Sequence, residues 1–322
     1  MQDLKSFTSF IEKEIEKFSF PSSPENLYEP LRYFLKIGGK RMRPILTLLG
    51  GLAFDCEAHK TKDAALAVEF FHNFSLIHDD IMDEAPLRRG TSTIHEKWDQ
   101  NIAILSGDVL LIKAYQVLSS YDADTFKKLM GLFNKTAVEV CEGQQLDMDF
   151  ETRKEVKIEE YIEMIRLKTS VLLGCALEMG AIVANANQKD KELIYDFGMN
   201  IGIAFQIQDD ILDLYADPEK FGKQVGGDII ANKKTLLMLK AFEMSNEQQL
   251  KDLEALLVTK DPTKKVLNAQ QLFNEIGVYQ ACESIKDTYY QKALKSLEQL
   301  SVSDVKKAPL KSLALYVMQR DV

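Results

Sequence analysis

Apolar residues in this chain recur at intervals of three and four over long stretches, and this period restricts the fold more than any other feature. Val68, Phe71, Phe74 and the segment 77–81 fit one side of a helix, and residues 201–212 repeat the pattern. Alternating runs of the kind that form strands are few, and the prolines fall at the ends of the periodic segments. The sequence therefore predicts an all-α fold of roughly ten or more helices.

Composition narrows the class of protein further. The chain has 322 residues, 46% of them hydrophobic, which is enough for one large core, and we expect a single domain over residues 1–322. The net charge of −9 argues against a nucleic-acid partner. The four cysteines are far apart in the sequence and form no CxxC pair, so we expect reduced thiols.

Membrane segments are not expected from the apolar pattern. Residues 1–18 lack the basic region and apolar run of a signal peptide. The longest apolar run, at 171–184, is interrupted by Glu178 and is shorter than the roughly 18–20 residues that a spanning helix needs. The sequence predicts a cytoplasmic protein without stable membrane insertion.

Two apolar segments carry the same triple of aspartates. LIHDDIMD occupies residues 76–83 and IQDDILD occupies residues 207–213. On a helix the first and last aspartates of each motif lie on one face, where like charges repel, and apolar flanks make the cost larger. Mg²⁺ is usually held by one or two carboxylates together with substrate phosphates. One copy alone would be an exposed acidic helix end, but two copies favour metal ions that bind a diphosphate.

Basic residues gather beside glycine turns or next to the aspartate motifs. They occur in GGKRMRP (38–44), LRRG (87–90), KTS (168–170), FGKQVGGD (221–228) and NKKT (232–235). Arginine and lysine side chains suit phosphate oxygens, so the set favours an anionic substrate. Any single member can instead be a solvated surface charge, which is the interpretation we favour for Arg41 and Lys234.

These motifs together resemble those of the trans-isoprenyl diphosphate synthases, the short-chain polyprenyl synthetases. The resemblance runs over nearly the whole chain and also includes AVEFFHNFSLIHDDIMD (67–83), GDVLL (107–111), GQQLD (143–147), FQIQDDILD (205–213) and the terminal QRD. It implies an all-α, isoprenoid-synthase-type helical bundle around a deep central cavity, usually as a homodimer. It also implies Mg²⁺-dependent, head-to-tail condensation of isopentenyl diphosphate with an allylic diphosphate.

The resemblance further implies roles for individual residues. Three Mg²⁺ ions would be bound by carboxylates, chiefly those of Asp79, Asp83 and Asp209, with support from Asp80, Asp213 and Asp228. The allylic diphosphate would be bound by Arg88, Lys168 and Lys223. Isopentenyl diphosphate would be bound by Lys40, Arg43, His72 and Arg89, and Lys233 would be a further substrate contact. The carbocation would be stabilised by oxygen atoms of Thr169, Gln206 and the Lys168 carbonyl.

His72 has an alternative interpretation, because a lone histidine on an apolar helix is often a satisfied core group. It lies two turns before Asp79 on the same face, which favours contact with the substrate. No role is expected for His59, His78 or His95.

The length of the product would depend on the helix that carries Asp79. Ser75, Phe74 and Phe71 precede this aspartate by roughly 6, 7.5 and 12 Å along the helix axis. In the family that the chain resembles, one aromatic residue at the position of Phe74 and no insertion in the first motif favour a C20 product, geranylgeranyl diphosphate, over C15. The alternative is that Phe74 packs against a neighbouring helix and the floor lies elsewhere.

Two other functions remain open. A class I terpene cyclase shares the implied fold and the first aspartate motif, but its second metal motif differs and it does not need the GGKRMRP residues. A non-catalytic subunit of a prenyl synthase usually has degraded aspartate motifs, whereas both are intact here.

Overall fold

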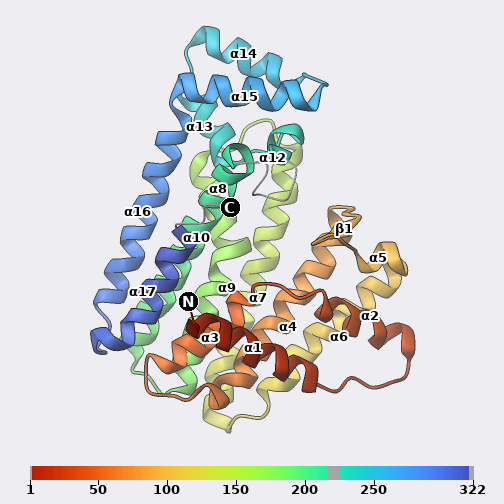
Figure 1. The fold of residues 1–322 in the computed structure, drawn as a ribbon, viewed down its shortest axis with the longest axis vertical. Coiled ribbons are helices and arrows are strands. Elements are labelled where there is room, and N and C mark those ends of the chain that lie inside the picture. The colour runs from red at the N-terminus through yellow and green to blue at the C-terminus, as the bar shows by residue number, and fades with distance from the viewer. Residues whose placement is uncertain (1, 217–224, 319–322) are drawn as a thin grey trace. The chain divides into compact units, whose positions relative to one another are not determined.

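The computed structural model describes residues 2–216 and 225–318, and nearly all of the elements in these ranges are helices (Figure 1). The described strands form one short antiparallel hairpin, in which β1 (Leu87–Arg88) pairs with β2 (Thr91–Ser92). The all-α prediction is therefore confirmed.

The chain divides into two compact units. Unit 1 comprises residues 1–134 and 175–192, and unit 2 comprises residues 135–174 and 193–322. Three long helices pass from one unit into the other along the chain: α7 (Ala123–Thr152), α9 (Val171–Val183) and α10 (Gln188–Tyr215).

Unit 1 is built around α4, the helix that carries the first aspartate motif. Its other helices are α1 (Gln2–Lys17), α2 (Glu25–Lys36), α3 (Met42–Leu52), α5 (Ile94–Lys97) and α6 (Gln100–Leu118), and α4 spans Ala58–Met82. Helix α4 lies side by side with α3 and α6 (Figure 1). Val68 and Phe70 are fully buried and Phe71 is nearly so, hence the middle of α4 is covered on several sides.

Helix α3 and the unit 1 part of α9 approach each other at glycines. A Cβ atom added to Gly180 would lie 2.1 Å from the Thr47 carbonyl oxygen, and one added to Gly50 would lie 2.2 Å from that of Leu177. Any larger side chain would force the two backbones apart. The glycines thus set the packing that holds the GGKRMRP segment, which leads into α3.

Helix α6 is the one described helix that is long and apolar enough to cross a membrane. It is a helix of unit 1 that packs along α2 and α4. Core helices of soluble proteins have the same length and composition, so α6 is weak evidence for a membrane segment.

Unit 2 packs a stripe of α10 against the helices that follow it. These are α12 (Gly227–Ile230), α13 (Leu236–Met244), α14 (Glu247–Leu257), α15 (Pro262–Ile276), α16 (Val278–Glu298) and α17 (Asp304–Met318). Ile203, Ile207 and Ile211 of α10 are buried with residues of α13 and α15 in one core cluster. Their spacing of four residues places them on one face of α10, which turns Gln206 and Asp209 away from that stripe.

A π-helix interrupts the helical path between α8 (Ile158–Ile165) and α9. This segment, η1, spans Arg166–Ser170 and contains the KTS motif. Two glycines hold it: a Cβ on Gly143 of α7 would lie 2.2 Å from Lys168 N, and one on Gly202 of α10 would lie 2.7 Å from Ser170 Cα. Single π turns are frequent at functional sites, and this one fixes where Lys168 and Thr169 point.

Candidate active site

The GGKRMRP and LRRG motifs meet in unit 1. Gly39 has a φ of +146°, and a Cβ there would lie 2.4 Å from Arg89 Nη1, so the guanidinium of Arg89 rests on a position that requires glycine. Arg43 Nη1 lies 3.0 Å from His72 Nε2. The structure therefore brings together Arg43 and His72, and it packs Arg89 against the loop that also holds the exposed Lys40.

Mutual repulsion and burial shift the pKa values of this cluster. Burial, and then the charges of Arg43 and Arg89, hold the pKa of His72 well below its usual value of 6.5. Burial lowers the pKa of Arg43 to about 10 and also lowers that of Arg89. Because arginine only donates hydrogen bonds, the neutral Nε2 of His72 accepts from Arg43. A bound anion would relieve the repulsion.

Arg41 was expected to be a solvated charge, and this expectation is wrong. Its side chain is 4% exposed, and Nη1 donates to Glu69 Oε1 at 2.5 Å. Nη2 donates to the Leu35 carbonyl at 2.7 Å, and Asn73 Nδ2 donates to the same Glu69 oxygen at 2.9 Å. The arginine anchors the loop between Gly39 and Arg43 in the core, with φ of +49° at its own position.

The first aspartate motif lies at the carboxyl end of α4. Asp79 is half-buried, Asp83 is exposed, and the Asp83 backbone N–H donates to the Asp79 carbonyl at 2.8 Å. The negative end of the helix dipole adds to the repulsion between these carboxylates. The helix dipole is also unfavourable for the carboxylates of the second motif, because α10 ends at Tyr215, two residues after Asp213.

Asp80 makes a different contact from its neighbours. It is 1% exposed, and both of its oxygens accept from Arg88 Nε, at 2.8 and 2.9 Å. Arg88 Nη2 also lies 2.6 Å from Asp80 Oδ1. The pair holds the guanidinium of Arg88 next to the first motif, and the support of Asp80 in metal binding stays a prediction.

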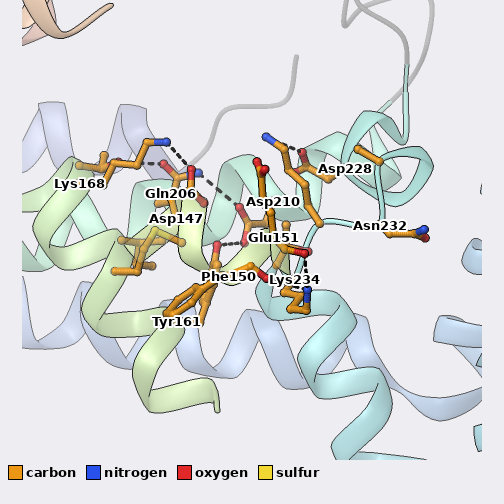
Figure 2. A pocket seen from close by; sticks show the side chains of 16 residues that line it. Asp147, Phe150, Glu151, Tyr161, Lys168, Gln206, Asp210, Asp228, Asn232 and Lys234 are labelled. Carbon is orange, nitrogen blue, oxygen red and sulfur yellow. Dashed lines mark hydrogen bonds and ion pairs between the residues drawn. The ribbon is translucent and has the colours of Figure 1, made fainter. Parts of the chain in front are cut away.

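Unit 2 contains a cavity of about 670 Å³ that gathers most of the predicted residues of that unit (Figure 2). Its wall includes Lys168, Thr169 and Gln206, together with Asp228 and Lys233. Lys168 forms an ion pair with Asp147 of the GQQLD element. Lys233 lies 3.9 Å from Asp228 Oδ1. Lys223 lies outside the described residues.

Burial, with help from neighbouring carboxylates, raises the pKa of two aspartates in this unit. Burial and the charge of Asp228 raise the pKa of Asp213 to about 6, and burial raises the pKa of Asp228 as well. Asp213 Oδ2 accepts a hydrogen bond from Asp228 N at 3.0 Å, which connects the second aspartate motif to the last residue of FGKQVGGD. Carboxylates that are this costly to ionise without a counterion suit a hard divalent cation.

Metal ions would need ligands beyond the protein. In the described parts of the chain, no three acidic, histidine or cysteine side chains converge closely enough to hold an ion by themselves. Mg²⁺ usually keeps waters and binds one or two carboxylates plus substrate phosphates. Asp79, half-buried beside Asp83, and Asp209, half-buried on α10, fit that arrangement.

Lys234 was also expected to be a solvated charge, which is wrong. Its Nζ donates to the Phe150 carbonyl at 2.7 Å and to the Glu151 carbonyl at 3.3 Å. These carbonyls belong to the last turn of α7, whose acceptors need partners. Lys234 therefore joins the end of α7 to the segment before α13 at the rim of the cavity (Figure 2).

The cavity is also lined by Asp147, Tyr161 and Asp210, which received no role from the sequence. Asp147 could have been predicted from the sequence, because it ends the GQQLD motif (143–147), one helical turn after Gly143. Tyr161 and Asp210 are 49 residues apart, and their hydrogen bond is a tertiary contact. Burial raises the pKa of Asp210 to about 7 and that of Tyr161 well above 10.

The three residues of the predicted floor lie on α4 in unit 1. Phe71 is buried, and its ring lies 5.6 Å from that of Phe74 and 5.3 Å from that of Phe133. Phe74 is half-buried and packs edge-on against His78 of its own helix at 4.7 Å. Ser75 donates to the His72 carbonyl. The role of Phe74 in product length stays a prediction.

Comparison with known proteins assigns the chain to a family. A family model described as polyprenyl synthetase matches residues 24–276. The geranylgeranyl diphosphate synthase of Methanosarcina mazei is 42% identical over 245 residues, 76% of either chain. The geranylfarnesyl diphosphate synthase of Natronomonas pharaonis is 39% identical over 264 residues, again 76% of either chain. A crystal structure of a geranylgeranyl pyrophosphate synthase is 46% identical, covers 99% of both chains and gives a TM-score of 0.95. The chain belongs to the polyprenyl synthetase family and is a trans-prenyltransferase.

Proposed function

We propose that the enzyme condenses isopentenyl diphosphate with allylic diphosphates, head to tail, to give geranylgeranyl diphosphate. The observation that carries this proposal is the packing of Arg43 against His72, 3.0 Å apart, and of the Arg89 guanidinium against Gly39, which holds basic groups together where an anion would stabilise them. A terpene cyclase, with one diphosphate substrate, has no use for this second anion site.

The reaction begins when the allylic diphosphate is bound and its bond to C1 breaks. Arg88, held by Asp80, and Lys168, held by Asp147, bind the diphosphate, with Lys223 as a third cation. The family depends on divalent metal ions, and Mg²⁺, three ions in our proposal, would supply positive charge to the leaving group through Asp79, Asp83 and Asp209. Lys233 would help to bind the same diphosphate.

The allylic cation then needs oxygen dipoles and not a nucleophile. Lys168, Thr169 and Gln206 line the unit 2 cavity, and Thr169 Oγ1, Gln206 Oε1 and the Lys168 carbonyl would supply these dipoles. Isopentenyl diphosphate, held by Lys40, Arg43, His72 and Arg89, attacks C1 with the electron pair of its double bond. The new cation loses a proton to the released diphosphate, which restores a double bond and completes the step.

The molecular setting is part of the proposal. We infer that both units form one polyprenyl synthetase domain in a cytoplasmic homodimer without membrane insertion. Exposed apolar side chains on α6 support an interface there: Ile104 is 37%, Leu105 57% and Ile112 53% exposed. Side chains of this kind are covered in stable dimers.

A product assay tests the proposed function. The purified enzyme receives Mg²⁺, isopentenyl diphosphate and, in separate reactions, C5, C10 or C15 allylic diphosphates, and the dephosphorylated products are sized by chromatography. We expect C20 from every primer. Products of C15 or C25 would leave the reaction standing but refute the C20 assignment, and the absence of elongation would refute the synthase.

The role of Phe74 is tested in the same assay. Phe74→Ala should lengthen the product, because the truncated side chain opens the path along α4. Phe242→Ala is the control, since Phe242 is a half-buried phenylalanine of α13, a helix of unit 2, and is not part of the predicted floor. Unchanged products from Phe74→Ala would remove Phe74 from the floor.

A further inference from the structure

A chain of hydrogen bonds in unit 2 links the cavity to a buried carboxylate. The Thr169 hydroxyl donates to Gln206 Oε1 at 3.2 Å, and Gln206 Nε2 donates to Asp210 Oδ1 at 3.3 Å. Asp210 Oδ2 accepts from the Tyr161 hydroxyl and, at 3.4 Å, from Leu236 N. Asp210 is 5% exposed, so both of its oxygens are engaged inside the protein. Figure 2 shows the links of Asp210 with Tyr161 and with Gln206.

The chemistry of these groups fixes the orientation of the Gln206 amide. Gln206 donates through Nε2 to Asp210 and accepts through Oε1 from Thr169, and an amide nitrogen only donates whereas an amide oxygen only accepts. Gln206 must therefore turn its NH₂ group toward Asp210 Oδ1, and this leaves its carbonyl oxygen on the side of Thr169. The carbonyl oxygen is the negative end of the amide dipole, and Gln206 and Thr169 both line the cavity.

We propose that Asp210 is a positioning residue, which acts by holding the carbonyl oxygen of Gln206, and not its NH₂ group, toward the allylic cation. This role rests on the proposed function, since it concerns the same reaction. It differs from metal binding, which the position of Asp210 inside the second aspartate motif would suggest. The direct catalytic contact belongs to Gln206, and Asp210 acts through it.

Asp210→Asn should reverse the amide instead of merely loosening it. The Tyr161 hydroxyl and Leu236 N both donate to the Oδ2 position, so the carbonyl oxygen of the new asparagine has to lie there. Its NH₂ group then occupies the Oδ1 position and faces Gln206. Gln206 has to answer with its own oxygen, which turns its NH₂ group, the positive end of the dipole, toward Thr169 and the cavity.

The kinetic test uses four proteins: the unaltered enzyme, Asp210→Asn, Gln206→Met and the double variant. A reversed dipole repels the cation, whereas methionine only removes the dipole. We expect kcat to fall about 100-fold in Asp210→Asn and about 10-fold in Gln206→Met, with KM values within about twofold. The double variant should match Gln206→Met, so the second substitution restores activity to Asp210→Asn. The Mg²⁺ concentration for half-maximal rate should not change.

A binding test provides a readout that does not require turnover. Calorimetric titration compares two inert ligands: an allylic diphosphate analogue with an ammonium nitrogen in place of C3, and an allylic thiodiphosphate with an uncharged chain. Asp210→Asn should weaken binding of the ammonium analogue at least about tenfold and leave the thiodiphosphate unaffected. Thermal melting of the variants checks that each is folded.

Several outcomes would overturn the assignment. If Asp210→Asn costs as much in the Gln206→Met background as alone, Asp210 does not act through Gln206. If it raises the Mg²⁺ requirement, Asp210 is a metal ligand. Equal losses of both analogues would indicate a general defect of the site. If the unaltered enzyme forms no prenyl diphosphate, the proposed function is refuted. The two failures are distinguishable, because the role of Asp210 is judged only from differences between the variants and an active unaltered enzyme.

Discussion

The buried ion pair between Arg41 and Glu69 allows a sharp test of the packing in unit 1. Both side chains are 4% exposed, and Glu69 has the Asn73 amide as its other hydrogen-bond donor. Arg41→Met would leave the Glu69 carboxylate buried without its cation and the Leu35 carbonyl without its donor. Breaking one side of a buried pair costs about 3–5 kcal/mol, a large share of the roughly 5–15 kcal/mol that stabilises a typical fold.

Urea unfolding followed by circular dichroism measures this loss. With a slope near 3 kcal/mol per M, the midpoint should fall by roughly 1–1.7 M. Lys17→Met is the matched control, because Lys17 is 69% exposed and pairs with Glu14 three residues away. Such a surface pair contributes about 0–1 kcal/mol.

The double variant Arg41→Met with Glu69→Leu separates charge from packing. Replacing a buried pair by apolar groups is often neutral, and Asn73 keeps a bond to the Glu69 carbonyl at 2.7 Å. We expect the double variant to recover most of the lost stability. If Arg41→Met shifts the midpoint no more than Lys17→Met does, or if Glu69→Leu does not rescue it, the buried pair does not contribute as the geometry indicates.

Three further predictions concern packing, pH and metal. Gly180→Ala should lower the free energy of unfolding by about 1–3 kcal/mol or more, because its Cβ would lie 2.1 Å from the Thr47 carbonyl oxygen. Gly131→Ala is the control: its Cβ would lie in open space, and the change should stabilise α7 by up to about 1 kcal/mol. Equal melting temperatures for the two variants would contradict this prediction. The pKa of Asp210 is raised from 3.8 to about 7, so the folded state holds a proton that the unfolded state releases, and the free energy of unfolding falls as pH rises from about 4 to about 7. Asp210→Asn should therefore gain stability relative to the unaltered protein across that window, by about 1.4 kcal/mol per pKa unit, and a pH-independent difference would refute the assignment. Chelation with EDTA should abolish condensation and Mg²⁺ should restore it, whereas activity that persists in EDTA would exclude a metal-bound diphosphate.

The helical period was sufficient to predict the all-α fold, and the resemblance to the polyprenyl synthetases pointed to five residues that line the unit 2 cavity: Lys168, Thr169, Gln206, Asp228 and Lys233. Local patterns record this information, because a helix places residues four apart on one face. Arg41 and Lys234 were misjudged for a different reason. Their partners, Glu69 and Phe150, lie 28 and 84 residues away, so nothing in the neighbouring sequence shows that these basic side chains are buried or half-buried.

The same reason explains why Tyr161 received no role from the sequence and neither did Asp210, although Asp210 is part of the second aspartate motif. A tyrosine and an aspartate are ordinary surface residues until tertiary packing removes water from both. The π-helix η1 was missed because residues 166–170 have no composition that marks it. What fixes it is the close approach of Gly143 and Gly202, two glycines that by themselves have many possible meanings.

The π turn at Arg166–Ser170 also sets the rotation of α8 relative to α9 about the helix axis. It accommodates an extra residue in one turn, so the faces of α8 and α9 follow two separate registers that differ by about 100°. Deleting one residue there would leave every catalytic group in the protein and restore a regular helix. It would nevertheless rotate one helix against the other. A change of a single residue in length, with no change in chemistry, would then turn Lys168 and Thr169 away from the unit 2 cavity that they line.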